Sequence, residues 1–448
     1  MSYFSVHNHT DYSNIRLLDS INTPKSLIDT AIKHGLSGIA ITDHECISGH
    51  IEFIEAYNKI KDKNPKFTIA LGNETYIIDQ KEDRDYFRHL ILLAKDEIGY
   101  QQMRELTSLA WLNRKSYRGL ERVYLHKEQL KEVISKNPGH IIATSACIGG
   151  VFGDKILSLQ QEGDISHLKQ VLVDEILWYK DVFKDDLYLE IQPSNQADQL
   201  FVNLIIKNVS KAVDLPVIFS TDSHYGTKEE KILHSAFLHS QEGDRETEDF
   251  YSTTYVMKYQ EVQEYLLQSF TAEEIEQMRK NTLCIKNKIQ EFNIFKPQQV
   301  PHVSVKSLTH PGNTGYEFID KLMDCEYEED RYLMRFCVQE LNRKGKNSSE
   351  YMERLNIEAE QIDLISHKLE QRLSSYFNLV QKMVDIGWAT GSFIGPSRGS
   401  ALGFLVNYAM GITQIDPVKF GLSQWWRFAH ESRPELADES TSPKLAIA

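Results

Sequence analysis

The sequence lacks three features that would point outside the cytosol. Its five cysteines are scattered, odd in number and without a Cys-x-x-Cys pair, which favours a reducing compartment over a disulfide framework. No apolar run reaches the roughly 18 residues of a membrane-spanning helix, so no membrane span is expected. The first residues carry neither a basic segment nor a long apolar one, so no secretory signal is expected. We therefore expect a cytoplasmic protein.

The sequence also has no excess of positive charge. With 50 lysines and arginines against 64 acidic residues, its net charge is −14, which gives no overall attraction to nucleic acid. A nucleic-acid partner would need a local basic patch or bound divalent cations. The length of 448 residues, 41% hydrophobic and 25% charged, is typical of a globular protein with two or three domains.

What the sequence does have is a pair of histidines after its first apolar segment. Residues 3–6, Tyr-Phe-Ser-Val, favour a strand. His7 and His9 follow at its end, and alternate side chains of a strand share a face. Neutral imidazole is the commonest metal ligand, and strand ends are where barrels open their sites. Taken alone, the pair could also be two ordinary surface histidines.

Short apolar runs alternate with amphipathic helical segments through the first half. Helices are expected after Thr23-Pro24, at 168–183 and at 200–213, apolar at helical spacing. Strands covered on both faces are expected at 38–42, 67–71, 90–93, 140–144, 187–189 and 216–220. This alternation predicts an α/β fold with parallel pairing. About seven such units favour a barrel over an open sheet.

Metal-ligand side chains recur at the ends of these strands. Singly, each has a plain explanation: His44 as a core histidine, Glu74 as a solvated carboxylate, Cys147 as a small buried residue, Asp222 as a helix cap. One histidine, His89, precedes its strand instead of following it. Together the candidates offer imidazole, carboxylate and thiolate, and they are His7, His9, Asp19, His44, Glu74, His89, Cys147, Asp222 and His224. Nine donors exceed one four-coordinate site, so two or three ions are expected.

The motifs that contain these residues resemble the polymerase and histidinol phosphatase (PHP) superfamily. The matching segments are 7–9, 42–44, 72–74, 145–147 and 222–224, while 17–19 and 89–95 resemble the N-terminal domain of the bacterial DNA polymerase III alpha subunit. The resemblance implies a distorted (β/α)7 barrel over residues 1–285, with the nine candidates binding two or three zinc, manganese or iron ions. Asp43 and Glu190 are expected beside them, taking part in catalysis as orienting or outer-shell groups.

Clustered divalent ions favour one kind of chemistry. They lower the pKa of a bound water, orient a phosphodiester and stabilise the departing oxygen. We expect phosphoester hydrolysis, which the resemblance narrows to a 3′–5′ exonuclease-like activity on DNA. A basic stretch with interleaved aromatic residues suits single-stranded nucleic acid, although a solvated helical face explains it as well. Its members are Trp111, Arg114, Lys115, Tyr117, Arg118, Arg122, Tyr124 and Lys127.

The second half carries a glycine-rich turn at residues 393–403, after an expected linker at 297–312 and an amphipathic helix within 351–373. Such a turn exposes backbone N–H groups that can hold phosphate. With the flanks 411–417 and 426–435, it resembles the palm of the same alpha-subunit family, a member of the polymerase beta superfamily. The resemblance implies a partial α+β palm domain over 286–448. Its Gly395, Arg398, Gly399 and Ser400 would hold the triphosphate of an incoming deoxynucleotide.

The resemblance weakens at the palm carboxylates that bind magnesium. The family has an Asp-x-Asp pair on the next strand and a third aspartate much later. Here Asp438 matches the first aspartate, Ser440 stands at the second, and the sequence stops at Ala448. We therefore expect the front part of a polymerase that does not add nucleotides by itself. Its expected partners are DNA, deoxynucleotides and either other replisome subunits or the missing C-terminal part.

Other functions stay open. A stand-alone phosphatase related to histidinol phosphatase would have no use for the turn or for Arg-Pro-Glu at 433–435. A non-catalytic scaffold, stabilised by metal and docking a proofreading partner, would keep the same ligands. An amidohydrolase would share the first histidine pair, but it would not need Glu74 and Cys147 together with the final Asp-x-His.

Overall fold

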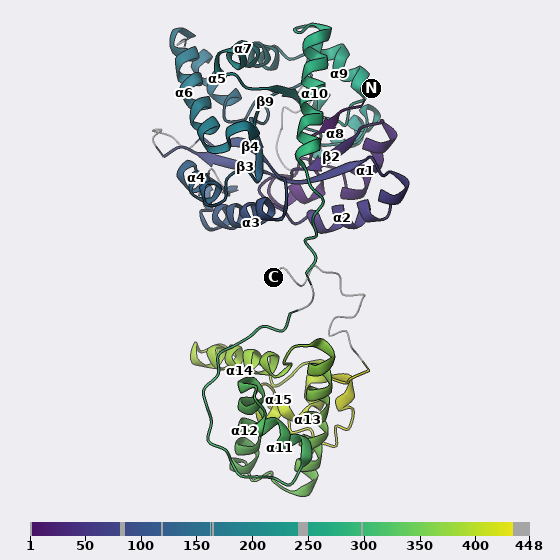
Figure 1. Ribbon diagram of the computed structural model, residues 1–448, viewed down its shortest axis with the longest axis vertical. Helices are drawn as coiled ribbons and strands as arrows, with labels where there is room; N and C mark the ends of the chain where they lie inside the picture. Colours follow the sequence, from purple (N-terminus) through teal and green to yellow (C-terminus); the bar gives the residue numbers. More distant parts are fainter. Residues whose placement is uncertain are drawn as a thin grey trace. The chain divides into compact units, whose positions relative to one another are not determined.

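The computed structural model describes residues 2–80, 86–117, 120–161, 163, 165–240, 250–296 and 299–432. The chain forms two compact units, Met1–Ile294 and Phe295–Ala448 (Figure 1). The boundary expected after residue 285 falls inside helix α10 (Ala272–Lys288). This helix belongs to the first unit because Ile285 is buried in one apolar cluster with Phe4 and Ile218 of the sheet.

The first unit is built on a curled eight-stranded sheet. Backbone hydrogen bonds from His9 N to Ser223 O (2.8 Å) and from Ser223 N to His7 O (3.3 Å) join its two ends. The expected α/β fold with a barrel-like sheet is confirmed. The strands follow in the order β1 (Phe4–Ser5), β2 (Gly38–Ile41), β3 (Thr68–Ile78), β4 (Arg88–Ala94), β8 (Ile141–Thr144), β9 (Leu187–Ile191) and β10 (Val217–Phe219), and β7 (Leu125–His126) pairs with β3.

One strand departs from the expected parallel pairing. Strand β4 runs antiparallel to both of its neighbours, β3 and β8. The connection from β3 to β4, residues 79–87, is shorter than the dozen or so residues that a parallel crossover requires. The reversal brings the first residues of β4, with His89, to the edge where β2 and β3 end.

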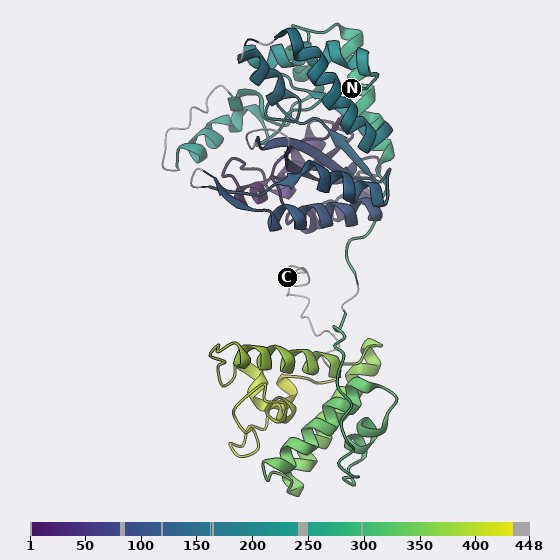
Figure 2. The ribbon, with the colours of Figure 1, turned by 90° about the vertical axis from the view of Figure 1, so that its left-hand side faces the viewer.

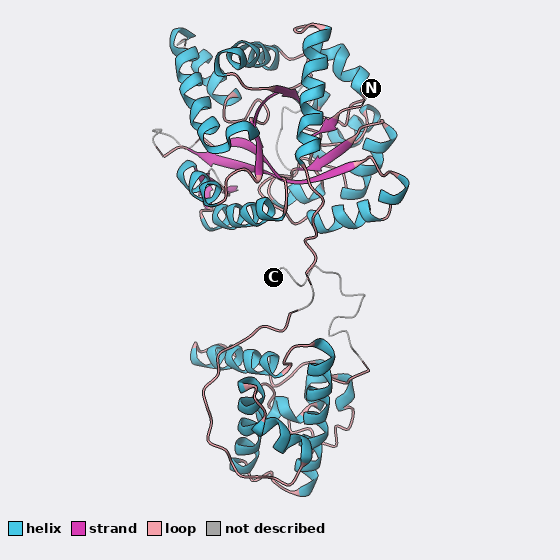
Figure 3. Ribbon diagram, viewed as in Figure 1, coloured by secondary structure: helices cyan, strands magenta, loops and turns pink. Residues whose placement is uncertain are grey.

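Helices cover the outer face of the sheet (Figures 1 and 3). Helix α1 (Pro24–Lys33) packs on β2, α3 (Glu97–Leu112) on β3 and β4, α6 (Ile165–Phe183) on β8 and β9, and α7 (Ala197–Val213) on β9 and β10. Because the inner face is also apolar, the strands are buried on both sides, which accounts for their nearly continuous apolar runs. The unit also contains α2 (His50–Asn58), α4 (Lys127–Lys136), α5 (Gly153–Gln161), α8 (Lys231–His239), α9 (Tyr259–Leu266), β5 (Lys115–Tyr117) and β6 (Leu120–Arg122).

The second unit is helical throughout its described part (Figure 2). We expected an α+β palm, but residues 299–432 contain no strand, and the strand expected beside Asp438 would lie outside the described residues. The helix expected within 351–373 is confirmed as α13. The helices are α11 (Glu317–Asp324), α12 (Glu328–Arg343), α13 (Ser349–Leu369), α14 (Ser374–Ala389) and α15 (Leu405–Ala409). Among the described residues of both units, no helix is long and apolar enough to cross a bilayer.

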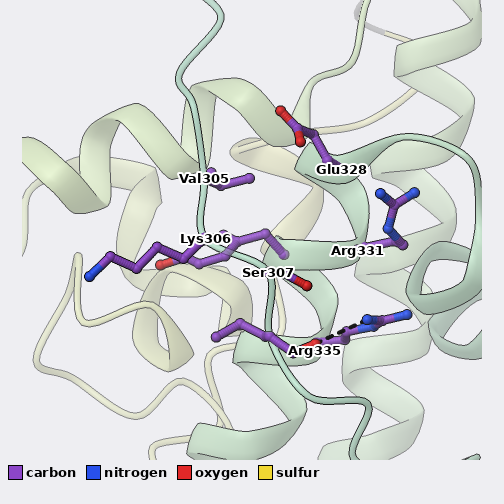
Figure 4. Close-up of a pocket in the computed structure, with 8 residues that line it drawn as sticks. Val305, Lys306, Ser307, Glu328, Arg331 and Arg335 are labelled. Atoms are coloured by element: carbon purple, nitrogen blue, oxygen red, sulfur yellow. Dashed lines mark hydrogen bonds between the residues drawn. The ribbon is translucent and has the colours of Figure 1, made fainter.

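Two arginines of α12 fasten the chain around α11, from the extended segment before this helix to the residue after it. Arg335 donates to Leu308 O at 3.0 Å and to Met323 O at 2.6 Å, and Arg331 donates to Cys325 O at 2.7 Å. With Lys306 they line a small cavity beside this segment (Figure 4). Since both guanidinium groups bind backbone carbonyls, we interpret the cavity as part of the packing of this unit.

We expect Gly38→Ala to destabilise the first unit. A Cβ atom at Gly38 would lie 2.1 Å from Thr68 O and 2.8 Å from Phe4 Cδ2, so β2 could not stay in place between its neighbours. Such overpacking typically lowers the free energy of unfolding by about 1–3 kcal/mol. Denaturant titration of the full chain, followed by circular dichroism, measures the loss. Gly395→Ala is the matched control, because its Cβ would meet no atom within 4 Å, and an equal loss in both variants would contradict the prediction.

Candidate metal centre

The nine residues predicted as metal ligands lie together at one edge of the barrel. Three groups have potential ligand atoms within 4.8 Å of one another: His9, His44 and His224; His7, His9 and Asp222; and Glu74, His89 and Cys147. The ninth residue, Asp19, places Oδ2 2.8 Å from His44 Nε2 and 3.4 Å from His224 Nε2. Residues that are more than 200 positions apart in the sequence therefore share one cluster.

Glu74 connects the three groups. Its Oε1 lies 2.7 Å from His89 Nδ1 and 3.4 Å from His7 Nε2, and its Oε2 lies 3.7 Å from His9 Nε2 and contacts His44 Nδ1. Strand β3 carries this residue, and a backbone bridge between Glu74 and His44 extends the pairing of β2 with β3 to the edge of the barrel. The carboxylate is thus placed where it could be shared between neighbouring ions.

Several polar atoms of the cluster are buried and lie close to charged neighbours, yet none of them has a partner aligned for a hydrogen bond. They are His7 Nε2, Asp19 Oδ1 and both carboxylate oxygens of Glu74. Leaving a buried polar atom unsatisfied costs about 1–3 kcal/mol, more when it is charged, so most such atoms are paired. Imidazole, carboxylate and thiol together are ligands of zinc, manganese and iron. The residues present therefore fit a group of bound divalent cations, which would satisfy these atoms.

Protons take the place of cations in the metal-free cluster. Burial by itself would lower the pKa of His7, but Asp222 and Glu190 raise it well above its ordinary value. Burial would also lower the pKa of His44, but Asp19 and Glu74 raise it well above its ordinary value. His9 differs: burial and the charges of His44 and His224 lower its pKa to about 3. The buried carboxylates thus hold protons on some imidazoles and leave another neutral.

Glu190, predicted beside the ligands, orients His7. On β9, its carboxylate accepts a hydrogen bond from His7 Nδ1 at 2.8 Å and also contacts the hydroxyl groups of Thr144 and Ser220. A carboxylate only accepts, so the proton sits on Nδ1 of His7. The other nitrogen, Nε2, faces Asp222 Oδ1 at 3.0 Å. In the neutral form of His7 that a metal requires, Glu190 therefore fixes the tautomer that leaves Nε2 unprotonated.

Asp43, the second predicted partner, reaches His9 through a residue that the sequence did not reveal. Its carboxylate accepts from Thr10 N at 2.6 Å and from Ser13 Oγ at 2.7 Å. Ser13 Oγ lies 3.0 Å from His9 Nδ1 and accepts from His44 N at 3.2 Å. Burial raises the pKa of Asp43 to about 6, against the lowering effect of these hydrogen bonds. The position of Ser13, four residues after His9, was the sequence feature that could have identified it.

Tyr76 is a second residue that sequence reasoning missed. Its ring stacks on His89 with centroids 4.4 Å apart and planes 10° apart, and its hydroxyl lies 3.3 Å from His44 Nδ1. Its position two residues after Glu74 on β3 puts both side chains on one face of the strand, which was the signal that could have identified it.

Backbone strain marks three strand ends of the cluster. Glu45, Ala146 and Asp222 adopt positive φ values of 52°, 58° and 44°. Side chains rarely adopt this left-handed region, which costs of the order of 1 kcal/mol and recurs at functional sites where surrounding contacts enforce it. Each of the three residues is a predicted ligand or adjoins one.

The glycine-rich turn of the second unit is an exposed feature. Gly395, Arg398, Gly399 and Ser400 are all exposed, and Gly399 has a φ of 58°, which suits glycine. Arg398 makes no hydrogen bond or ion pair with another described residue. Asp438, predicted as a remnant palm carboxylate, lies outside the described residues.

A partly buried arginine and a buried glutamate of α13 fasten the end of this turn. Arg354 donates to Gly403 O at 2.6 Å, and Glu358 accepts from Leu405 N at 2.8 Å and from Val406 N at 2.9 Å. The turn is therefore anchored at the start of α15, while the residues predicted to face phosphate remain accessible.

The middle of the basic aromatic stretch forms a hairpin of β5 and β6, while Trp111 lies on α3 and Lys127 begins α4. Lys115 Nζ lies 5.2 Å from the ring centroid of Tyr124, and Arg122 Cζ lies 5.4 Å from that of Phe87. Lys127 instead is buried and pairs with Asp79 at 3.1 Å and Glu175 at 2.7 Å, which is a structural role. Arg114 is exposed, and Arg118 lies outside the described residues.

Comparison with known proteins matches both halves of the chain. Residues 5–194 match the PHP domain, and residues 331–439 match the bacterial DNA polymerase III alpha NTPase domain. A solved amidohydrolase from Chromobacterium violaceum aligns with a TM-score of 0.33 at 14% identity over 50% of this chain and 88% of that chain, too weakly to support an argument.

Curated relatives match over nearly the whole chain. The protein named "Probable DNA polymerase YorL" of Bacillus subtilis and the DNA-directed DNA polymerase of Bacillus phage SPbeta are each 36% identical over 96% of this chain and 36% of the relative. The DNA polymerase III subunit alpha of Campylobacter jejuni is 29% identical over 98% of this chain and 36% of its own length. The chain thus spans about a third of these relatives. It contains a PHP domain and a DNA polymerase III alpha NTPase domain, and it is homologous to bacterial DNA polymerase III alpha subunits across most of its length.

Proposed function

We propose that the first unit is a metal-dependent phosphodiesterase that releases nucleotides from the 3′ end of single-stranded DNA. The observation that supports this proposal most is the buried cluster of imidazole, carboxylate and thiol groups around Glu74, whose oxygens have no hydrogen-bond partner. Its place in a PHP domain, homologous to replication enzymes, supports a phosphoester of DNA as the substrate.

The proposed ions are two or three of zinc, manganese or iron. They would be held by the three groups found in the cluster, with Asp19 beside His44 and His224. When bound, divalent ions supply a water of lowered pKa and positive charge beside the departing oxygen. All three metals accept this combination of imidazole, carboxylate and thiolate ligands.

The protein's own residues would prepare the centre. Glu190 keeps a proton on His7 Nδ1, and Ser13, held by Asp43, orients His9 through its Nδ1. Both histidines thereby turn Nε2 toward Asp222, at 3.0 Å and 3.1 Å. Because His7, His9 and Asp222 are almost completely buried, water is excluded and electrostatic interactions with a phosphate strengthen.

For the complete polymerase we propose nucleotidyl transfer to a DNA 3′ end. In the second unit, Gly395, Arg398, Gly399 and Ser400 would bind the triphosphate of a deoxynucleotide, with Asp438 as one magnesium-binding carboxylate. Other replisome subunits or further polymerase segments would be partners. The cytoplasm is the proposed location.

A second candidate function is a non-catalytic scaffold that bound metal stabilises. The same unsatisfied oxygens of Glu74 favour it, because cations that satisfy them would stabilise the unit whether or not turnover occurs. Metal content and hydrolysis must therefore be measured separately.

We expect the purified protein to hold two or three divalent ions per chain, counted by plasma emission spectrometry. Removal by a chelator should lower the melting temperature of the protein, because the carboxylates of the cluster would lose their counter-charge. Asp222→Asn should retain fewer ions than the wild type. A protein without bound ions after growth and purification with added manganese or zinc would contradict the proposed centre.

Hydrolysis is expected to depend on the cluster. His9→Ala and Asp222→Ala should each reduce metal-dependent release of mononucleotides from 3′-labelled single-stranded DNA at least about 100-fold. His239→Ala, which removes an exposed histidine of α8, is the matched control and should keep full activity. Activity that persists in both cluster variants would indicate a contaminant. Bound ions without activity in the wild type would favour the scaffold.

Metal binding should release protons at neutral pH. Asp222, Asp19 and their carboxylate neighbours raise the pKa values of His7, His44 and His224, so these imidazoles are protonated when metal is absent. Ligation requires the neutral form, so the apparent affinity should increase as pH is raised from about 6 to about 8. Calorimetric titration in buffers of different ionisation enthalpy counts the protons, and uptake of metal without proton release would contradict the raised pKa values.

A further inference from the structure

The side chain of an arginine in a loop of the metal centre makes a single hydrogen bond among the described residues. Arg16 Nε donates to Glu45 Oε2 at 2.6 Å, and the two side chains are 9% and 0% exposed. Among the described residues the guanidinium has no other hydrogen bond or ion pair. Both terminal nitrogens, Nη1 and Nη2, are therefore uncommitted although the side chain is largely buried.

The position of Arg16 ties it to the cluster. It directly follows the short 3-10 helix η1 (Asp11–Ile15), and its N–H donates to Ser13 O at 2.9 Å. Ser13 on one side of it contacts His9, and Asp19 on the other side contacts His44. Arg16 thus lies in the loop that supplies two residues of the centre.

Its partner Glu45 is held in a costly conformation. Glu45 follows His44 with a φ of 52°, and its N–H donates to Glu74 O at 2.8 Å while its carbonyl accepts from Trp111 Nε1 at 2.8 Å. Its Oε1 is buried without a hydrogen-bond partner. An ion pair that serves packing alone would gain from a two-pronged contact through both carboxylate oxygens, and this pair uses only one.

We infer that Arg16, anchored by Glu45, binds a phosphate group of the substrate at the metal centre. A guanidinium fixed through Nε presents its two terminal NH₂ groups in one plane, which matches two oxygens of a phosphate. In a protein of net charge −14, a phosphate needs such a local cation. The inference rests on the proposed phosphoester chemistry and adds the group that recognises the substrate. Glu45 is a positioning residue, because it contacts the arginine and not the phosphate.

The test is binding of thymidine 5′-monophosphate to the manganese-loaded full chain, measured by calorimetry. We expect Arg16→Gln to weaken binding about 10- to 100-fold, the usual effect of losing a charge-assisted contact. The affinity of Arg16→Lys should lie between those of the wild type and Arg16→Gln, because lysine keeps the charge but lacks the planar fork of the guanidinium. Metal content should stay at the wild-type value in both variants. Arg104→Gln, on the exposed face of α3, is the control and should bind as the wild type does.

A double variant separates recognition from loop stability. Arg16→Gln leaves the buried Glu45 without its partner, which can disturb the loop by itself. Arg16→Gln combined with Glu45→Gln removes that charge. If Arg16 binds phosphate, the double variant stays as weak as Arg16→Gln. Recovery of wild-type affinity in the double variant would overturn the inference and show that the ion pair of Arg16 and Glu45 only stabilises the loop.

Three further outcomes are decisive. Wild-type affinity in Arg16→Gln, or no measurable nucleotide binding by the manganese-loaded wild type, would also overturn the inference. Nucleotide binding that depends on Arg16, without hydrolysis of single-stranded DNA by the wild type, would support the inference and contradict the proposed exonuclease. The two proposals can therefore fail independently.

Discussion

Buried negative charge is the constraint on which the first unit depends. Asp19 and Glu74 are each 1% exposed and Asp222 is 3% exposed. An ion taken out of water costs several kcal/mol unless opposite charge lies close to it. Neighbouring imidazoles supply that charge as protons, and bound cations would supply it more fully. Glu190 orients His7, and Asp43 orients His9 through Ser13, so that Nε2 of both histidines faces Asp222. The arrangement is therefore stable only if positive charge occupies its middle.

The barrel explains how distant residues reach this middle. Closure between His9 and Ser223 brings the first and last strands of the sheet side by side, and Asn8 donates to Ala40 O at 3.0 Å while it accepts from Ser223 Oγ at 2.7 Å. The asparagine between the two histidines thus ties three strand ends together. Strand β4 runs in the reverse direction and contributes His89, its second residue. A ligand can therefore lie near the start of one strand and near the end of another and still reach the same edge of the barrel.

The sequence alone predicts those features that follow from local pattern. Two-sided burial makes the strands apolar throughout, so the runs near residues 39 and 142 were recognisable, and parallel strands place residues such as His44 at a shared edge. The direction of β4 depends on the length of a connection, which the alternation of strands and helices does not reveal. Ser13 and Arg16 were missed because a polar residue in a loop gains its role only when the fold brings a partner such as Asp43 or Glu45 to it. The helix within 351–373 was predicted from its own apolar spacing, whereas the palm strand implied by the resemblance depends on residues around Asp438 that lie outside the described part of the chain.

Local support of positive charge is common to Arg16 and Arg398, which are proposed to bind phosphate, and to the basic hairpin of β5 and β6. Arg16 rests on a buried carboxylate, Lys115 and Arg122 rest on aromatic rings, and Arg398 stands exposed on an anchored turn. A uniformly basic surface would attract polyanions everywhere, whereas isolated cations on rigid supports attract them only at defined positions. With a net charge of −14, long-range repulsion opposes nonspecific contact, and binding must come from short-range contacts in which geometry matters. Selectivity for a phosphate that fits these positions would then follow from the same charge distribution that makes the protein acidic as a whole.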